Sequence, residues 1–257
     1  MFRSSISVVM PAYNEGTSLA SVLEHLHATL EDVRARHDVE LIVVDDGSTD
    51  ATAGILGGFA AERPGALRIC THAENKGLVE AMKTGARAAG GSTLVMLDAD
   101  LSYAPELVET LARTLRETNA AAVLASPYMP GGRVANVPLD RLVASRVANW
   151  LLARCVGGRI KTFTGMVRAY DSALFRTLIE RPTRGEFNAW AVAELLAAGS
   201  TLVEIPAALV WPESRTAAAP RLTVKKLWQR MLLVLETAQV LIAANRVLAA
   251  QRPARVV

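Results

Sequence analysis

Cysteine, aromatic residues and long apolar runs are all scarce in this chain of 257 residues. Its two cysteines, Cys70 and Cys155, stand apart in apolar segments and form no metal-binding or redox motif, so we expect packed thiols in a reducing compartment. No segment has the roughly 18 apolar residues of a membrane-spanning helix, and the apolar run 6–10 is too short for the core of a secretory signal. We therefore expect a cytoplasmic protein that can meet the inner face of the cell membrane only peripherally.

Two common phosphate-binding loops are also missing. No Gly-x-Gly-x-x-Gly follows the first predicted strand, and the chain has no Gly-Lys-Ser/Thr loop. These loops hold phosphate through backbone amides, so dinucleotide-binding and P-loop proteins are disfavoured. Lysine is scarce too: it supplies five of the 28 basic residues, and the net charge is only +3. An arginine-rich chain favours anionic partners that a guanidinium group can bind bidentately. Among the anionic partners, we expect no nucleic acid.

What the chain does have is a regular alternation of short apolar runs and helical patterns. The runs are residues 6–10, 40–44, 67–71 and 94–97. Each is short and mostly apolar, as in a strand that is buried on both faces. Strands that alternate with helices predict an α/β fold with a mostly parallel central sheet flanked by helices.

Polar residues follow each of these strands. Because right-handed crossovers bring the carboxyl ends of parallel strands to one edge of the sheet, these side chains should meet there. They are Tyr13, Asn14, Glu15, Asp45, Asp46, Lys76, Asp98 and Asp100. Neighbouring carboxylates resist ionisation unless a cation compensates, and a hard divalent ion binds through one or two carboxylates and the phosphates of a substrate. The edge thus predicts a site for a metal and a phosphate-bearing ligand, although Asp98-Ala99-Asp100 alone would suit an ordinary turn.

Four motifs at these strand ends resemble glycosyltransferase family 2 in order and spacing. They are Val-Met-Pro-Ala-Tyr-Asn-Glu at 9–15, Val-Val-Asp-Asp-Gly-Ser-Thr-Asp at 43–50, Asn-Lys-Gly-Leu at 75–78 and Asp-Ala-Asp at 98–100. The resemblance implies the GT-A fold, a nucleotide-sugar-binding α/β domain. The residues it implies around the base and ribose are Pro11, Tyr13, Glu15, Val44 and Asp46. By the same resemblance Asp98 and Asp100, with Ala99 between them, would hold Mg²⁺ or Mn²⁺ against the diphosphate.

The second half is similar to dolichol-phosphate mannose synthases and their bacterial polyprenyl-phosphate relatives. By that resemblance Arg141 and Ser145 would receive the phosphate of the acceptor, and Arg215 and Arg221 would clamp the nucleotide diphosphate. Arg141 and Ser145 are four residues apart, so on a helix they share one face and could grip one phosphate. Without the family context, a solvated arginine and an unengaged serine would be the simpler interpretation.

Several positions depart from the family pattern. The Gln or Asn that usually follows the metal-binding pair is Ser102, a shorter ligand. The usual Ser-Arg-Tyr has Pro127 in place of its arginine, for which Arg133 is a candidate substitute, and a usual Asp is Lys161. The usual Gly-x-Ser-Lys is Ala-Ala-Pro-Arg at 218–221. These changes affect the region expected to bind the acceptor phosphate, the segment expected to clamp the nucleotide diphosphate, and the third expected metal ligand.

We expect a GT-A domain over residues 1–222, followed by an amphipathic helix and basic tail over 223–257. The expected apolar stripe of that helix is Leu227, Met231, Val234, Ala238 and Leu241. Lys225, Lys226 and Arg230 surround Trp228 near its start, an arrangement that suits an anionic membrane surface. Packing of the same stripe on the body, or on another subunit, is an equal alternative.

These features predict an inverting, metal-dependent enzyme that moves a hexose from a GDP- or UDP-sugar to a polyprenyl or dolichyl phosphate. Asp100, Arg141 and Ser145 would be its catalytic residues. One alternative is transfer to a hydroxyl group, which needs a carboxylate base such as Glu186 or Glu194. Another is a weakly active nucleotide-sugar-binding protein. The sequence leaves the sugar, the base and the oligomeric state open.

Overall fold

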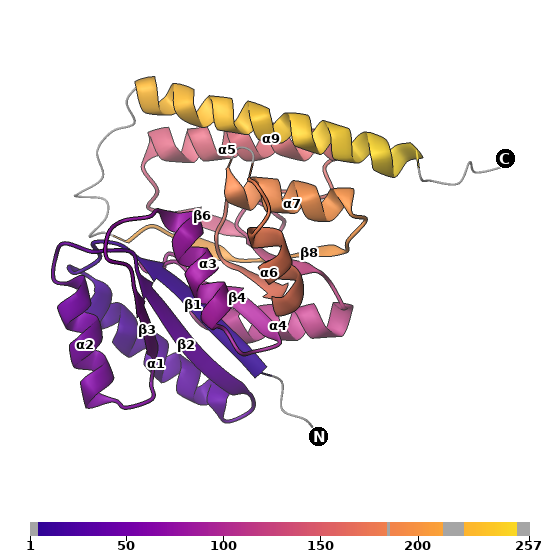
Figure 1. Cartoon of the computed structure of the whole chain (residues 1–257). Coiled ribbons are helices and arrows are strands. Elements are labelled where there is room, and N and C mark those ends of the chain that lie inside the picture. The colour runs from indigo at the N-terminus through magenta and orange to yellow at the C-terminus, as the bar shows by residue number, and fades with distance from the viewer. Residues whose placement is uncertain (1–4, 184–185, 213–223, 251–257) are drawn as a thin grey trace.

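The computed structural model describes residues 5–183, 186–212 and 224–250, with 224–227, 230 and 244–250 described by their backbone alone. Its centre is a seven-stranded sheet in the order β3-β2-β1-β4-β7-β5-β8 (Figure 1). In chain order these strands are β1 (Ser5–Ala12), β2 (Asp38–Asp45), β3 (Arg68–Thr71), β4 (Thr93–Met96), β5 (Ala122–Ser126), β7 (Arg168–Asp171) and β8 (Leu202–Pro206). A second sheet pairs β6 (Arg133–Ala135) with β9 (Ala208–Val210).

The four predicted strands form β1 to β4 and pair in parallel, which confirms the expected α/β class. The exception to parallel pairing in this sheet is β7, which is antiparallel to both β4 and β5. Helices follow most of the strands along the chain. They are α1 (Leu19–Arg34), α2 (Thr52–Glu62), α3 (Leu78–Ala88), α4 (Leu107–Thr118), α5 (Leu139–Cys155), α6 (Ser172–Ile179), α7 (Phe187–Ala197) and α9 (Val224–Ala250).

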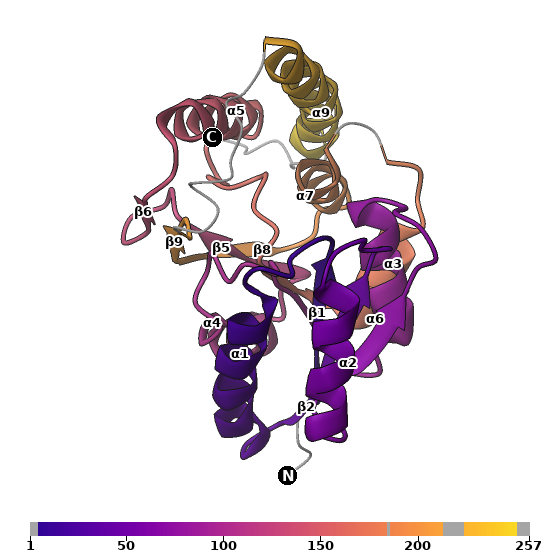
Figure 2. The ribbon, with the colours of Figure 1, turned by 90° about the vertical axis from the view of Figure 1, so that its left-hand side faces the viewer.

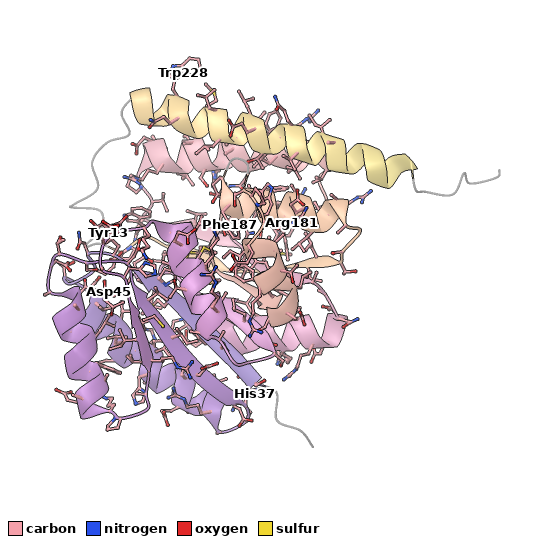
Figure 3. The ribbon with its side chains drawn as sticks, viewed as in Figure 1. Tyr13, His37, Asp45, Arg181, Phe187 and Trp228 are labelled. Atoms are coloured by element: carbon pink, nitrogen blue, oxygen red, sulfur yellow. The ribbon has the colours of Figure 1, made fainter. Side chains whose placement is uncertain are left out.

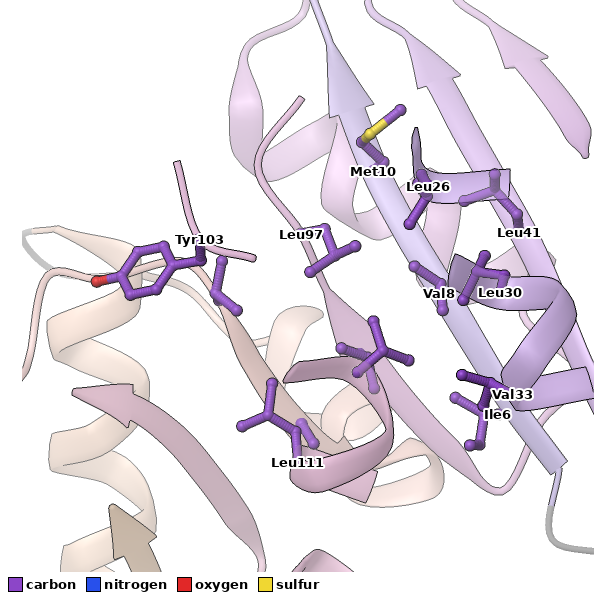
Figure 4. Close-up of a cluster of buried hydrophobic side chains, with 14 of the residues drawn as sticks. Ile6, Val8, Met10, Leu26, Leu30, Val33, Leu41, Leu97, Tyr103 and Leu111 are labelled. Atoms are coloured by element: carbon purple, nitrogen blue, oxygen red, sulfur yellow. The ribbon is translucent and has the colours of Figure 1, made fainter. Parts of the chain in front are cut away.

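Both faces of the sheet are covered, because its apolar strands point side chains to alternate sides. Ile6, Val8 and Met10 of β1 pack with α1, α2 and α4 on one face (Figure 4). Val9 of the same strand packs on the other face, against α3 and α6. Figure 2 shows the sheet between α1 and α4 on one side and α3 and α6 on the other. This arrangement leaves the carboxyl ends of β1, β2 and β4 together at one edge.

A third layer lies beyond that edge and consists of α5, α7 and α9. Figures 1 and 2 show α9 lying along α5 and α7 at the end of the molecule opposite the N-terminus. Phe163 and Leu152 lie at the centre of the buried cluster that holds these helices together. Among the described residues, no helix combines the length and the hydropathy that crossing a bilayer would require. The expected boundary at 222/223 lies outside the described residues.

The apolar stripe of α9 was predicted only in part. Val234, Ala238 and Leu241 pack on the body as expected, whereas Met231 is exposed. The prediction was wrong for Met231 because the buried face of the helix is rotated away from it and includes Thr237 instead. The hydroxyl of Thr237 donates to Leu233 O at 2.8 Å, which satisfies it inside the contact. The side chain of Leu227 lies outside the described residues.

Candidate active site

The loops after β1 and β2 hold each other at the edge of the sheet. Tyr13 and Asp45 mark this edge in Figure 3. Several hydrogen bonds join the loops, among them Asn14 N to Ser48 Oγ (3.0 Å), Thr49 N to Asn14 Oδ1 (2.8 Å), Glu15 N to Thr52 Oγ1 (2.9 Å) and Gly16 N to Asp50 Oδ2 (2.9 Å). Bonds from Thr52 lower the pKa of the exposed Asp50 carboxyl. Much of the two motifs is therefore scaffolding, which fixes Tyr13 and Glu15 at the rim.

The predicted nucleotide residues differ in exposure. Tyr13 is 44% exposed and can stack on a base from the rim. Pro11 is buried, and Val44 has no exposed surface, so neither side chain is open to a nucleotide in this structure. Whether these residues bind a nucleotide stays a prediction.

Asp46 is buried and holds the next loop. Its Oδ1 accepts from Lys76 N at 3.0 Å, and its Oδ2 accepts from Gly77 N at 2.8 Å. Its Oδ1 also lies 2.7 Å from Nδ1 of His72, whose Nε2 lies 2.8 Å from Thr84 Oγ1. Sequence reasoning gave His72 no role, although its place directly after the third strand put it at the same edge. Asp46 thus fixes the loop that precedes α3.

Gly47 makes this packing possible. Its φ is +70°, and a Cβ there would lie 2.3 Å from the carbonyl carbon of Glu74. Any other residue would force the loops after β2 and β3 apart.

Asp98, Asp100 and Ser102 gather in one turn after β4. Leu101 has a left-handed backbone with φ of 46°, and its N–H donates to Asp98 O at 3.2 Å. This conformation turns Ser102 back, so that its N–H donates to Asp100 Oδ1 at 2.9 Å and its hydroxyl donates to Asp98 Oδ2 at 3.4 Å. The three predicted metal ligands therefore lie together.

The donor atoms of this turn fit a divalent ion. Two carboxylates and a hydroxyl are the hard oxygen ligands that Mg²⁺ and Mn²⁺ accept. Within the described ranges no cluster of three or more Asp, Glu, His or Cys side chains could enclose a metal. A partial ligand set of this kind suits an ion that takes its remaining ligands from a bound diphosphate.

These acids open into a cavity of about 320 Å³. Its polar and aromatic lining includes Asp98, Asp100, Ser102, Tyr103, Tyr128, Ser145, Thr164, Glu186, Asn188 and Trp211. Burial and the nearby Asp98 raise the pKa of the Tyr103 hydroxyl, which keeps it protonated. The cavity brings the predicted metal ligands and the predicted acceptor residue Ser145 into one space.

Ser145 and Arg141 share one face of α5, as predicted. Tyr128 donates its O–H to Ser145 Oγ at 2.8 Å, and Asn149 Nδ2 lies 3.3 Å from the same oxygen. The guanidinium of Arg141 lies over the ring of Trp211, 5.4 Å from its centroid. Trp211 lines the cavity, so Arg141 borders it through this ring.

The two carboxylates proposed as a base are placed differently. Glu186 lines the cavity, and its side chain caps α7 by accepting from Asn188 N at 3.2 Å and Ala189 N at 2.8 Å. Burial raises the pKa of the Glu186 carboxyl above its usual range. Glu194 instead pairs with Arg181 at 2.6 Å and is not part of the cavity lining.

The remaining predicted basic residues do not complete the site in the part of the chain that is described. Arg133 is exposed on β6 and lines neither this cavity nor the larger one beside it, so the structure does not place it as a substitute for the missing arginine. Arg215 and Arg221 lie outside the described residues. Tyr128, Trp211 and His72 were missed because each acts through a contact between segments distant in sequence.

The chain is similar to known glycosyltransferases. A family model described as glycosyl transferase family 2 matches residues 7–179. Polyprenol monophosphomannose synthase of Mycolicibacterium smegmatis is 36% identical over 168 residues, which are 63% of this chain and 60% of that protein. Dolichol-phosphate mannosyltransferase of Pyrococcus furiosus is 28% identical over 78% of this chain and 55% of that protein. The chain thus spans about three-fifths or less of the length of these relatives.

A solved structure with the same fold is mannosyltransferase PcManGT from Pyrobaculum calidifontis, in complex with GDP-Man and Mn²⁺. It has a TM-score of 0.61 and 19% identity, and it covers 98% of this chain and 77% of its own. The predicted GT-A fold is confirmed by this likeness. With four motifs at one sheet edge and a family model that spans most of the chain, this protein belongs to glycosyl transferase family 2.

Proposed function

We propose that this protein transfers a hexose, with inversion, from a GDP- or UDP-sugar to a polyprenyl phosphate. The observation that carries the proposal is the shared cavity, which has Asp98 and Asp100 on one side and Ser145 on another. A donor and an acceptor must meet in one space for direct transfer. The names of the similar proteins, which act on polyprenol and dolichol phosphates, support this acceptor class.

The donor half of the proposed reaction depends on balancing the negative charge of the nucleotide diphosphate. Asp98, Asp100 and Ser102 are proposed to hold Mg²⁺ or Mn²⁺ with the nucleotide diphosphate. When bound, the ion would supply positive charge against the charge that builds on the leaving diphosphate. Tyr13 and Glu15 at the rim are proposed to bind the nucleoside. The Mn²⁺ complex of PcManGT supports a divalent ion for this fold.

The acceptor half of the proposed reaction depends on the orientation of the lipid phosphate. A lipid phosphate already carries negative charge near neutral pH, because its second pKa is about 6, so it needs positioning rather than a strong base. The Ser145 hydroxyl accepts from Tyr128, which leaves its own proton free to donate to a phosphate oxygen. Arg141, fixed on the face of Trp211, supplies the positive charge at the border of the cavity.

The outer layer supports peripheral attachment to a membrane at its cytoplasmic side. Trp228 points away from the body in Figure 3. The outer faces of α5 and α9 expose Leu139, Val143, Val147, Trp150, Trp228, Leu232, Leu235 and Ile242. Apolar and aromatic side chains on two adjacent helices suit insertion into the headgroup region, where the lipid acceptor would be found.

The proposal is tested by incubating the full chain with radiolabelled GDP- and UDP-sugars, polyprenyl phosphate and Mg²⁺ or Mn²⁺. Label should enter the organic phase with at least one donor, and EDTA should stop it. If no donor labels the lipid, the proposed acceptor is wrong.

A second candidate is transfer to a hydroxyl group, because Glu186 lies in the same cavity with a raised pKa. Such an acceptor must lose a proton, and a carboxylate with a raised pKa is a suitable base. Glu186→Gln should abolish transfer to a hydroxyl but spare transfer to a lipid phosphate. Turnover with either acceptor would eliminate a purely nucleotide-sugar-binding protein.

A further inference from the structure

A second and larger cavity, of about 790 Å³, lies beside the proposed active site. Its lining includes Tyr128, Met129, Gly132, Arg146, Asn149, Trp150, Arg154, Gly158 and Lys161. Pro127 and Tyr128 line both cavities and separate them. The proposed reaction uses none of the charged residues of the larger cavity.

Three positively charged side chains line this cavity, and none of them has an acidic partner in the described part of the chain. Among the described residues no carboxylate pairs with the side chains of Arg146, Arg154 or Lys161. Elsewhere exposed arginines do find such partners, as Arg36 does in Glu109 (2.7 Å) and Arg87 does in Glu180 (2.7 Å). Like charges around one space repel one another, and an anion placed among them relieves the repulsion.

Two of the charges are arranged by α5. Arg146, Trp150 and Arg154 follow one another at intervals of four residues, so they lie along one face of the helix. The guanidinium of Arg154 lies 5.3 Å from the centroid of the Trp150 ring, which limits the positions that this arginine can take. The helix thus presents two guanidinium groups and an exposed aromatic ring to the same cavity.

The third positive charge belongs to Lys161, which lies in the loop after α5. Gly157 and Gly158 both have positive φ, 68° and 72°, and they reverse the chain toward the helix. Glu204 could have neutralised Lys161, but its carboxylate accepts from the backbone instead, from Lys161 N at 2.9 Å and Thr162 N at 2.8 Å. Glu204 therefore anchors the backbone of Lys161 and Thr162 and forms no ion pair with the Lys161 ammonium group among the described contacts.

We infer that the larger cavity is a second anion site, which binds a phosphate group other than the one expected at Ser145. Guanidinium groups match the oxygens of phosphate bidentately, and Trp150 offers an apolar surface to the group that carries the phosphate. The phosphate can belong to a soluble molecule or to a lipid headgroup, since both present the same oxygens. This inference goes beyond the proposed function and does not depend on it.

The test compares the full chain with Arg154→Gln and Lys161→Gln. The matched control is Arg159→Gln, which removes one charge from an exposed residue of the same loop that does not line the cavity. Binding of inorganic phosphate is measured by calorimetry, and binding to phosphatidylcholine vesicles with and without phosphatidylglycerol by co-sedimentation. The series is repeated with Ser145→Ala, to remove phosphate bound at that residue.

We expect each cavity variant to weaken binding about tenfold, the loss of one charge-assisted contact, and the control to weaken it less than twofold. A loss seen with inorganic phosphate assigns the site to a soluble phosphate group. A loss seen only with phosphatidylglycerol vesicles assigns it to a headgroup. Equal effects of all three variants, or no effect with either probe, would show ordinary surface charge and overturn the inference.

Discussion

At the scale of single residues, the backbone of Leu101 sets the geometry of the acidic turn. A non-glycine residue with positive φ is uncommon and costs of order 1 kcal/mol. Here it turns Ser102 back onto both Asp98 and Asp100. The motif spacing predicted that these three would act together. It could not predict that they share a cavity with Ser145, Glu186 and Trp211, because this depends on how α5 and α7 pack.

Asp100→Asn tests the charge of this turn without removing its hydrogen bond. The amide oxygen can still accept from Ser102 N, so the fold should persist. Transfer should fall by about 100-fold or more, as when a group that stabilises developing charge is lost. Label transfer and the cooperativity of thermal unfolding are measured together. A non-cooperative transition would mean that Asp100 is structural.

Glu186 should make stability depend on pH. Because burial raises the pKa of its carboxyl, the folded state favours the protonated form. That stabilising contribution is complete below the ordinary pKa and is lost as the pH rises through the raised pKa. Glu186→Gln stays neutral, so its free energy of unfolding relative to wild type should rise between pH 4 and pH 8, by about 1.4 kcal/mol for each unit of pKa shift. Urea unfolding at several pH values measures this, and parallel curves would contradict it.

At the scale of elements, strand ends and loops are tied together by side chains that the sequence motifs contain. Alternating apolar runs were enough to predict β1 to β4 and their helices, since each is set by local pattern. The antiparallel strand β7 was not predicted. It enters the sheet between β4 and β5, and its position depends on pairing with strands more than 40 residues away.

His72 connects three elements, because it follows β3, contacts Asp46 after β2 and contacts Thr84 of α3. His72→Ala would leave the buried Asp46 and the partly buried Thr84 each short of a hydrogen bond. We expect the free energy of unfolding to fall by about 1–3 kcal/mol, measured by urea denaturation. The exposed His25→Ala on α1 is the control and should change it by less than about 0.5 kcal/mol. Equal effects would rule out a linking role for His72.

At the scale of the whole molecule, the protein is a sheet covered on both faces, with a third helical layer over its functional edge. The sequence pattern of α9 allowed a membrane, the body or another subunit as its partner, and the structure shows one packed and one exposed face of this helix. Its inner face packs on α5 and α7, while Trp228 and Leu232 are exposed on the other. The sequence could not settle this, because both uses need an apolar stripe.

The exposed apolar face should matter only when the acceptor is in a bilayer. Val143→Asp places a charge on α5, and we expect lower vesicle binding and slower transfer to polyprenyl phosphate in vesicles. Transfer to the same lipid in detergent should be unchanged. Ala61→Asp, on the exposed surface of α2, is the control. An equal loss of transfer in detergent would contradict a membrane role.

The position of α7 links the innermost and outermost parts of this molecule. Its cap, Glu186, lines the cavity with the acidic turn, and its later residues Val192 and Leu196 lie under α9. Its eleven residues span about 16 Å, so the helix lies along α9 with its capped end at the cavity. The packing of α9 on the body and the shape of the cavity wall therefore depend on the same helix.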